Sequence, residues 1–229
     1  MRPINKGTAP RVYNNYQDAA NDLQDCIGCY CCYCERQIET NLAVEHIKPK
    51  SLVPGLRNSW TNFLLACTNC NSCKGRTPIV LNNYLWPDTD NTLLAFTYSI
   101  GGIVSANTAI PISIRRLANA TIRLVGLDVN PGNPIRRRRP TSRDKRWKRR
   151  LEVWQLADHL KLTLINNNNP VVRDLIIQVA IPHGMFSIWW TVFNNDQDMK
   201  TRLRAAFIGT ALDCFDAIEN LQTRPGGQI

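Results

Sequence analysis

The chain has 229 residues, of which 44% are hydrophobic, and its 28 lysines and arginines against 18 acidic residues give a net charge of +10. A chain of this length and composition can bury a substantial core, which excludes a disordered tail and a small domain held mainly by disulfides. The positive charge favours a polyanionic partner such as nucleic acid, and no apolar run is long enough to predict a membrane span.

The nine cysteines also limit the possible class of protein, because eight of them fall in two clusters. The first cluster occupies residues 26–34, the second occupies residues 67–73, and Cys214 stands alone. The odd number, the adjacency of Cys31 and Cys32, and the lack of an apolar leader at the start of the chain all argue against disulfides. We therefore expect reduced thiols in a cytoplasmic protein, available as metal ligands.

Two Cys-x-x-Cys knuckles predict a structural zinc site. Two residues separate the cysteines of each knuckle, so one turn can present both thiolates to a tetrahedral ion. Overlapping pairs such as Cys29/Cys32 and Cys70/Cys73 leave the register open. The ligands that we select are Cys31, Cys34, Cys67 and Cys70. Four thiolates close the coordination shell of Zn²⁺, and a binding free energy of roughly 10–16 kcal/mol would keep a small module folded.

Glu45 and His46 lie between the knuckles, near the end of the alternating segment LAVEHI, which is typical of a short strand. Neighbouring side chains of a strand point to opposite faces, so a bend or loop must redirect them if both serve one site. A carboxylate can hold a hard divalent cation, and a neutral histidine can take a proton from an attacking water. Taken alone, such a pair is also common on protein surfaces.

The residues that follow His46 favour the catalytic interpretation. Asn62 lies within the apolar segment WTNFLLAC, and Asn71 lies in the run CNSCKG, which also contains Lys74. With a zinc knuckle on either side, this pattern resembles the HNH (ββα-metal) nuclease family in its HNN form. The resemblance implies a strand that ends in an acid-histidine pair, a loop, a second strand and a short helix.

The resemblance also implies a role for each motif residue. Glu45 and Asn71 would hold a catalytic Mg²⁺ or Mn²⁺, and His46 would be the general base. Asn62 would fix the catalytic loop around the base. The predicted phosphate contacts in this segment are Lys74 and Arg57. Because the family's usual aspartate and final histidine are replaced here by Glu45 and Asn71, the identity of the metal stays open.

A narrower resemblance covers further blocks outside this motif, namely MRPINKG, NNYLWPDTDN, GMFSIWWTVF and AAFIGTALDCFD. They are similar to the HNH subunit of Septu-type anti-phage systems and to related retron-associated nucleases. This similarity implies a defence role in the cytoplasm of a bacterium or archaeon. It also implies an ATPase partner that controls the nuclease.

The basic residues concentrate in one segment, residues 115–150, which has 13 basic and 2 acidic residues. Prolines at 131, 134 and 140 indicate that the first part of its basic run is a loop. We expect this run to contact nucleic-acid phosphates, and an acidic protein surface is the alternative. The predicted contacts are Arg136, Arg137, Arg138, Arg139, Lys145, Arg146, Lys148 and Arg149.

The remaining segments predict one hairpin and several helices. Short β-branched runs flank Gly101 and Gly102, which indicates a hairpin there. Thr141 or Ser142 is expected to cap a helix through LEVWQLADHLKL, and Pro170 to open a second helix. The run TRLRAAFIGTALDCFDAIENL predicts an amphipathic helix that begins at Thr201 and places Cys214 on its apolar face.

The whole pattern predicts an α+β fold with a zinc-stapled ββα-metal module, then a short β-rich segment, then a mainly α-helical C-terminal region. The expected boundaries are an N-terminal segment 1–25, the nuclease module 26–80, a β and basic-loop segment 81–140, and a helical region 141–229. The predicted function is a metal-dependent endonuclease that cuts DNA. The alternative is a catalytically silent zinc-knuckle module that binds nucleic acid or assembles with a partner.

Overall fold

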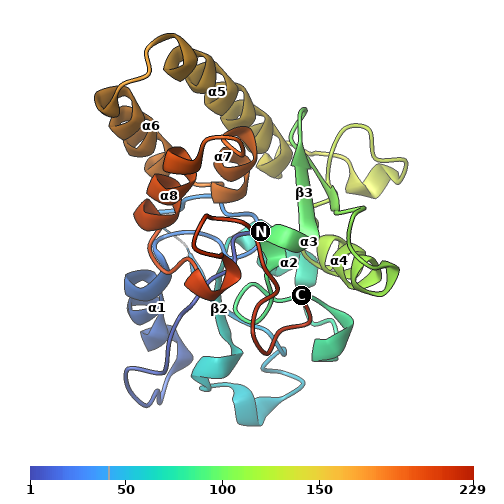
Figure 1. Cartoon of the computed structure of the whole chain (residues 1–229). Helices are drawn as coiled ribbons and strands as arrows, with labels where there is room; N and C mark the ends of the chain where they lie inside the picture. The colour runs from blue at the N-terminus through green and yellow to red at the C-terminus, as the bar shows by residue number, and fades with distance from the viewer. Residues whose placement is uncertain (41) are drawn as a thin grey trace.

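Helices surround two small antiparallel hairpins in the computed structural model, which describes residues 1–40 and 42–229 (Figure 1). The helices are α1 (Ala19–Ile27), α2 (Thr68–Lys74), α3 (Thr92–Ala95), α4 (Ile112–Val125), α5 (Arg146–Asn166), α6 (Pro170–His183), α7 (Phe186–Val192) and α8 (Gln197–Ala206). The strands are β1 (Ala43–His46), β2 (Phe63–Ala66), β3 (Phe96–Ser99) and β4 (Ile103–Ala106). This mixture of helices and small sheets confirms the α+β class.

The first hairpin carries the acid-histidine pair at the end of β1. Strands β1 and β2 are antiparallel, with Glu45 opposite Leu64 and His46 opposite Phe63. All four residues of β2 are buried, because α1 packs against this hairpin on one side and the rest of the core covers the other. Helix α2 follows β2 directly, so the order β1, β2, α2 is the expected one.

The second hairpin forms where the glycines predicted it, with Gly101 and Gly102 both at positive φ in the turn between β3 and β4. The term β-rich is nevertheless wrong for segment 81–140, because α4 is its longest element. The missed signal is the spacing of Ala118, Ile122 and Val125, which are buried on one face of α4.

Helix α5 begins at Arg146, so the predicted caps at Thr141 and Ser142 are wrong. The Thr141 hydroxyl instead accepts a hydrogen bond from the backbone N–H of Asp144, which forms a turn. The carboxylate of Asp144 then accepts from the Arg146 N–H. Helix α6 begins at Pro170 as predicted, because a proline is tolerated in the first helical turn.

The long helix predicted from Thr201 is also wrong. Helix α8 starts earlier, where Asp196 caps it, and ends at Ala206. Gly209 then takes a φ of +70° at a point where a Cβ would come within 2.8 Å of the Ile27 Cα, so the chain turns away from the helix axis here. Cys214 is buried in a short 3₁₀ turn rather than on a helix face.

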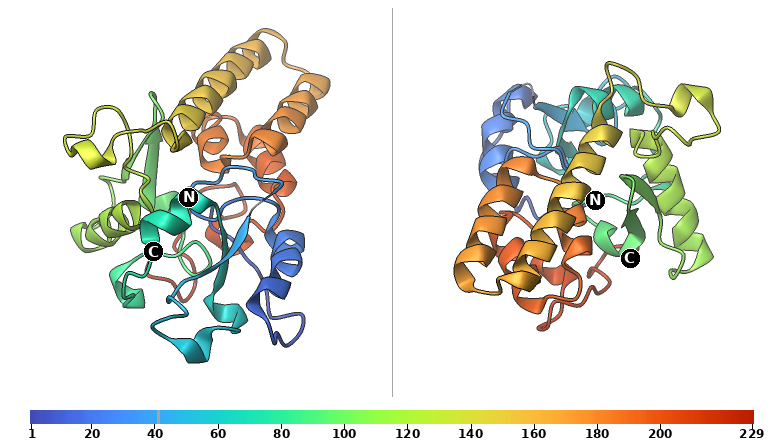
Figure 2. Two further views of the ribbon diagram at one scale, coloured as in Figure 1. Left: turned by 180° about the vertical axis from the view of Figure 1, so that it is seen from behind. Right: turned by 90° about the horizontal axis from the view of Figure 1, so that it is seen from above.

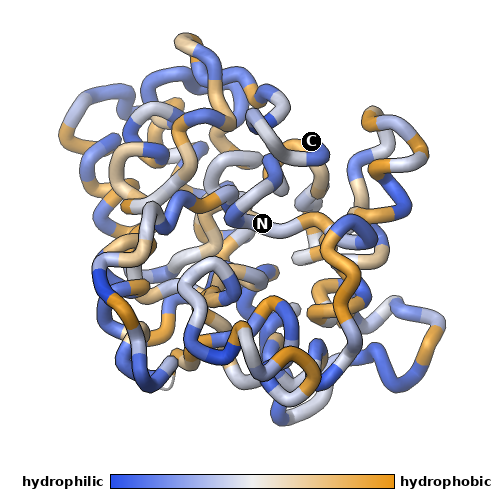
Figure 3. Tube along the Cα trace, turned by 90° about the horizontal axis from the view of Figure 1, so that it is seen from below, coloured by the Kyte–Doolittle hydropathy of each residue, from blue (hydrophilic) through white to orange (hydrophobic). Residues whose placement is uncertain are grey.

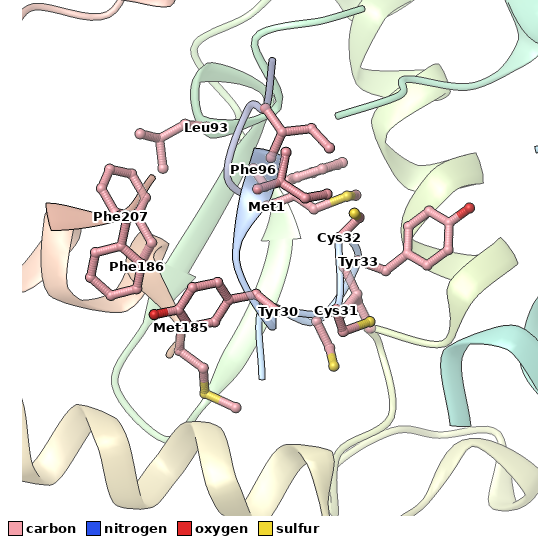
Figure 4. Packing of buried hydrophobic residues seen from close by; sticks show 14 of the residues in the cluster. Met1, Tyr30, Cys31, Cys32, Tyr33, Leu93, Phe96, Met185, Phe186 and Phe207 are labelled. Carbon is pink, nitrogen blue, oxygen red and sulfur yellow. The ribbon is translucent and has the colours of Figure 1, made fainter. Parts of the chain in front are cut away.

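One hydrophobic cluster draws residues from all four predicted segments. The close-up in Figure 4 places Cys31 and Cys32 of the first knuckle near Met1 and Phe96 within this cluster. Trp189 of α7 is fully buried in the same cluster, which assigns it to the core. Hydrophobic and hydrophilic stretches alternate along the trace (Figure 3), as expected where each element buries one side. Among the described residues, no helix combines the length and apolar character that a bilayer crossing requires.

Candidate active site and cysteine cluster

An open cavity of about 480 Å³ lies between β1, the loop that follows it, α2 and the segment that leads into α1. Figure 2 (left) shows β1 running between α1 and α2 on this side of the molecule. Glu45, His46 and Asn71 all line the cavity, as the resemblance implied. Strand β1 ends at His46 and the chain bends there, so two adjacent residues of the strand contribute to one wall.

His46 is buried and held from three sides. Its ring makes edge contacts with Tyr16 and Phe63, with centroid distances of 4.8 Å and 5.3 Å. Its Nε2 lies 2.8 Å from the backbone carbonyl oxygen of Arg57. Because a carbonyl oxygen can only accept, Nε2 must carry the proton, which leaves Nδ1 as the ring nitrogen able to accept one.

The electrostatic surroundings of His46 favour its neutral form. Burial is the main cause that lowers its pKa below the ordinary value of 6.5, and the positive charges of Lys50, Lys74 and Arg57 lower it further. A histidine that is neutral at pH 7 with a free Nδ1 is suited to accept a proton from water.

Asn62 holds the loop between the two strands closed. Its Oδ1 accepts from the Lys48 N–H at 2.8 Å, and its Nδ2 donates to the carbonyl oxygens of Lys48 and Leu56 at 3.0 Å and 3.3 Å. The same loop supplies the Arg57 carbonyl that orients His46. Asn62 therefore supports the base through the backbone and does not line the cavity itself.

Glu45 is buried beside a lysine of α2. Lys74 Nζ lies 2.7 Å from Glu45 Oε1 and donates a hydrogen bond to the His46 carbonyl oxygen, also at 2.7 Å. The Lys74 charge therefore compensates the buried carboxylate, whose Oε1 it faces directly. Burial raises the pKa of Glu45, and the charge of Lys74 opposes that effect.

The donor set suits a hard divalent cation. Glu45 offers carboxylate oxygens, one of which already faces the Lys74 ammonium, and Asn71 of α2, which lines the same cavity, carries an amide oxygen. The remaining coordination positions would face the cavity, where water and substrate can enter. These residues therefore fit a catalytic Mg²⁺ or Mn²⁺.

The structure corrects the predicted phosphate contacts in this segment. Lys74 is 1% exposed and engaged with Glu45, so it is not free to meet a substrate. Arg57 is exposed, and its guanidinium lies 5.9 Å from the Tyr16 ring centroid, but the residue does not line the cavity. Sequence reasoning missed Lys50 and Tyr16, which do line it, and the Lys50 ammonium lies 3.7 Å from the Tyr16 ring centroid.

The four selected cysteines gather in one buried cluster. Their sulfur atoms all lie within 4.8 Å of one another, which fits a tetrahedral zinc ion. Cys31 and Cys34 come from the first knuckle, whereas Cys67 caps α2 and Cys70 lies in its first turn. The neighbouring thiols of Cys31, Cys34 and Cys70 lower the pKa of the Cys67 thiol. The cluster therefore fixes the start of the helix that carries Asn71.

The neighbouring cysteines lie outside this group, so among the described residues the selected register, and not an overlapping one, forms the cluster. Cys29 Sγ donates to the Gln24 side chain, and Cys32 Sγ accepts from the Leu65 N–H. Cys73 is exposed on α2, and Cys26 is half-buried on α1.

The basic segment divides into exposed and structural residues. Of the predicted contacts, the exposed ones are Arg136, Arg137, Arg139, Lys145 and Lys148, with Arg149 half-exposed. Arg138 forms an ion pair with Asp128 at 2.7 Å. Arg146 is fully buried, so its predicted nucleic-acid contact is wrong: a guanidinium enclosed by protein cannot reach a phosphate. His159 is exposed on α5, and His183 bonds to the Val179 carbonyl of its own helix.

The hairpin of β1 and β2 is followed directly by α2, and Glu45, His46 and Asn71 line one cavity. Residues 31–77 match the model of the family described as HNH endonuclease. The matched segment begins at the first zinc-type knuckle, contains β1, β2 and α2, and includes Glu45, His46, Asn62 and Asn71. This match supports an HNH nuclease domain there, and HNH nucleases use divalent metals. No curated protein matches the chain.

Proposed function

We propose that this protein is a metal-dependent endonuclease that hydrolyses phosphodiester bonds of DNA at the cavity beside β1 and α2. The observation that carries the proposal is the state of His46, a buried histidine whose pKa is lowered, with Nε2 bound to a carbonyl oxygen and no hydrogen bond to Nδ1 among the described residues. It shares the cavity with Glu45 and Asn71, which offer oxygen ligands.

The residues divide the reaction between them. A divalent cation held by Glu45 and Asn71 would supply Lewis-acid stabilisation to the phosphate and the leaving oxygen. His46 Nδ1 takes a proton from the attacking water, and its Nε2–H bond to the Arg57 carbonyl keeps the ring in place as charge develops. Asn62 keeps the loop that carries this carbonyl closed. Lys50 and the exposed Arg76 both line the cavity, so each is placed to meet a phosphate oxygen.

A plasmid-nicking assay tests the proposal. The purified chain is incubated with supercoiled plasmid and Mg²⁺ or Mn²⁺, with and without excess chelator. We expect nicked and linear products that require the added divalent ion. A chain that binds DNA yet makes no nick under any of these conditions, also with its partner present, would instead be the catalytically silent binding module.

Replacement of Lys50 by methionine should weaken substrate binding more than it slows the chemical step. Loss of one charge-assisted hydrogen bond to phosphate is worth about 1.5–3 kcal/mol, so we expect kcat/KM to fall roughly 10–100-fold, mostly through KM. Steady-state cleavage of a labelled duplex measures both constants. Lys161→Met on α5 is the matched control and should cut like the wild type. Equal constants for Lys50→Met and wild type would remove Lys50 from the site.

The pH dependence should follow His46. The base must be unprotonated to act, and its pKa lies below 6.5, so the rate should be flat above about pH 7 and fall at lower pH. Glu45 must also be ionised to hold the cation, and burial raises its pKa, so its protonation adds to the loss of rate as the pH falls. The pH profile is measured from cleavage rates at saturating metal over roughly pH 5 to 9. A midpoint clearly above pH 7 would contradict the neutral state assigned to His46.

We also propose that the exposed arginines of residues 136–139 bind the DNA backbone. Each phosphate contact contributes roughly 0.9 to the slope of log K against log salt concentration. Glutamine at Arg136, Arg137 and Arg139 together should therefore lower this slope by about one unit per contact that is lost. Filter binding without divalent metal measures the slope. An unchanged slope would favour the alternative, an acidic protein surface as the partner of this loop.

The finer proposal is a role in anti-phage defence in the cytoplasm of a bacterium or archaeon, with an ATPase partner that controls cleavage. It is supported by the similarity of the outer sequence blocks to Septu-type nuclease subunits. The exposed apolar residues Val171 and Leu175 of α6 are also suited to contact another protein. An ATPase encoded beside this chain, co-purifying with it and changing its nicking rate with ATP, would support the proposal. An ATPase that neither binds nor changes the rate would contradict it.

A further inference from the structure

Arg146 is the first residue of α5, and its side chain lies against the cysteine cluster. It is fully buried, and Nη1 donates to Cys70 Sγ at 3.1 Å and to the Val125 carbonyl oxygen at 2.7 Å. Nη2 donates to Cys73 Sγ at 3.4 Å. The carboxylate of Asp144 accepts from Nε and Nη2 at 2.9 Å and 2.7 Å. Each nitrogen of the guanidinium therefore has at least one partner.

The surrounding chain is shaped to admit this guanidinium. Gly126 ends α4 with a φ of +70°, and a Cβ there would lie 2.8 Å from Cys73 Sγ and 2.9 Å from Arg146 Nη2. Such distances are too short for ordinary contact, so the close approach of α4, α2 and α5 requires glycine at this position. Arg146 and Cys70 are both fully buried, so the contact between them is not a chance surface pairing.

Electrostatics explain why a cation is placed here. Four thiolates around a divalent zinc ion carry a net charge of −2, and burial of a net charge is costly unless a counter-charge lies close by. Arg146 supplies that charge directly at Cys70, one of the four ligands. Hydrogen bonds from a second residue to metal ligands orient them and tune the metal.

From these contacts we infer that Arg146 is a positioning residue for the zinc-binding thiolates, through which the cysteine cluster anchors α5 and the basic segment to the nuclease domain. A second tether supports this role, because Asn69 Nδ2 of α2 donates to the Arg143 carbonyl oxygen at 3.1 Å. The cluster therefore joins the helix that carries Asn71 to the segment that carries the exposed arginines. This inference requires zinc at the cluster but not nuclease activity.

The test uses the full chain with Co²⁺ in place of Zn²⁺, because the cobalt–thiolate charge-transfer bands report on the sulfur atoms directly. Arg146→Gln should move these bands to lower energy, since a thiolate that loses a hydrogen-bond donor gives up electron density more readily. Competition with a chelator should show zinc affinity reduced by about 10–100-fold. Arg146→Lys, which keeps the charge with fewer donors, should lie between Arg146→Gln and the wild type in both measurements.

Arg150 provides the matched control. It is also buried on α5 and donates to the carbonyl oxygens of Gly102, Leu127 and Val129, with no hydrogen bond to a cysteine among the described residues. Arg150→Gln should leave the bands and the zinc affinity unchanged, even if it lowers stability. Wild-type spectra and affinity in both Arg146 variants, or the same shift in Arg150→Gln, would overturn the inference. Neither measurement involves cleavage, so the outcome is independent of the proposed nuclease function.

Discussion

Replacement of His46 by alanine is expected to reduce the rate of plasmid nicking by about 10²–10⁴-fold, the usual contribution of a general base. The side chain is the cavity's candidate for accepting the proton of the attacking water, and its free Nδ1 is fixed by the Nε2 bond to the Arg57 carbonyl. Zinc content should stay at that of the wild type, because His46 is not among the four clustered cysteines. Nicking rate and elemental analysis on the same preparations measure both effects.

His159→Ala is the control for this prediction, since His159 is exposed on α5 and lies outside the matched segment 31–77. It should cut at the wild-type rate. If His46→Ala and the wild type cut equally fast in the presence of metal, the base must be another group and the proposed mechanism fails. A variant that is inactive and has also lost zinc would indicate misfolding, which a melting curve would reveal.

Replacement of Cys67 by serine is expected to abolish stable zinc binding and to destabilise the nuclease domain. Cys67 is both one of the clustered sulfurs and the residue whose side chain caps α2 through the Cys70 N–H. Loss of a structural metal is one of the few single changes that lower the free energy of unfolding by about 4 kcal/mol or more. For a chain of this size such a loss lowers the melting temperature by roughly 8–16 °C.

The measurements are zinc per chain after gel filtration and the melting temperature by circular dichroism. The wild type should hold one zinc ion per chain, and Cys26→Ser should match it, because Cys26 lies outside the cluster. A wild-type protein that is purified without zinc and melts like its zinc-loaded form would refute the structural zinc site. Retention of zinc by Cys67→Ser would show that a different set of cysteines holds the ion.

Local patterns in the sequence predicted the elements that short-range physics controls. The hairpin at Gly101 and Gly102 followed from two glycines able to take positive φ. The start of α6 followed from Pro170, whose ring presets the first helical turn. The predicted start of α5 failed because Thr141 is drawn into a turn with Asp144. Whether the Thr141 side chain caps a helix or closes a turn depends on the residues packed around it in the fold.

The helix predicted from Thr201 failed for a related reason. The apolar spacing beyond Ala206 suits a helix, but the chain must pass close to the end of α1 at Gly209, and this packing overrides the periodicity. Helix α4 was missed although its apolar spacing is regular, because the surrounding Asn, Pro and Gly residues suggested loops and strands.

The sequence by itself determined the chemical groups and their order along the chain: two cysteine knuckles, an acid-histidine pair between them, and asparagines just before the second strand and on the following helix. Spacing is enough for this, since metal ligation and proton transfer require specific side chains at short separations. Only the tertiary structure decided which charged residues are free to act. Lys74 and Arg146 carry the positive charge expected of nucleic-acid contacts. Both are buried, however, and Lys74 pairs with Glu45 whereas Arg146 donates to the cysteine cluster. Lys50, Tyr16 and Asn71 meet at one cavity because elements distant in sequence pack together, and a linear pattern does not encode that proximity.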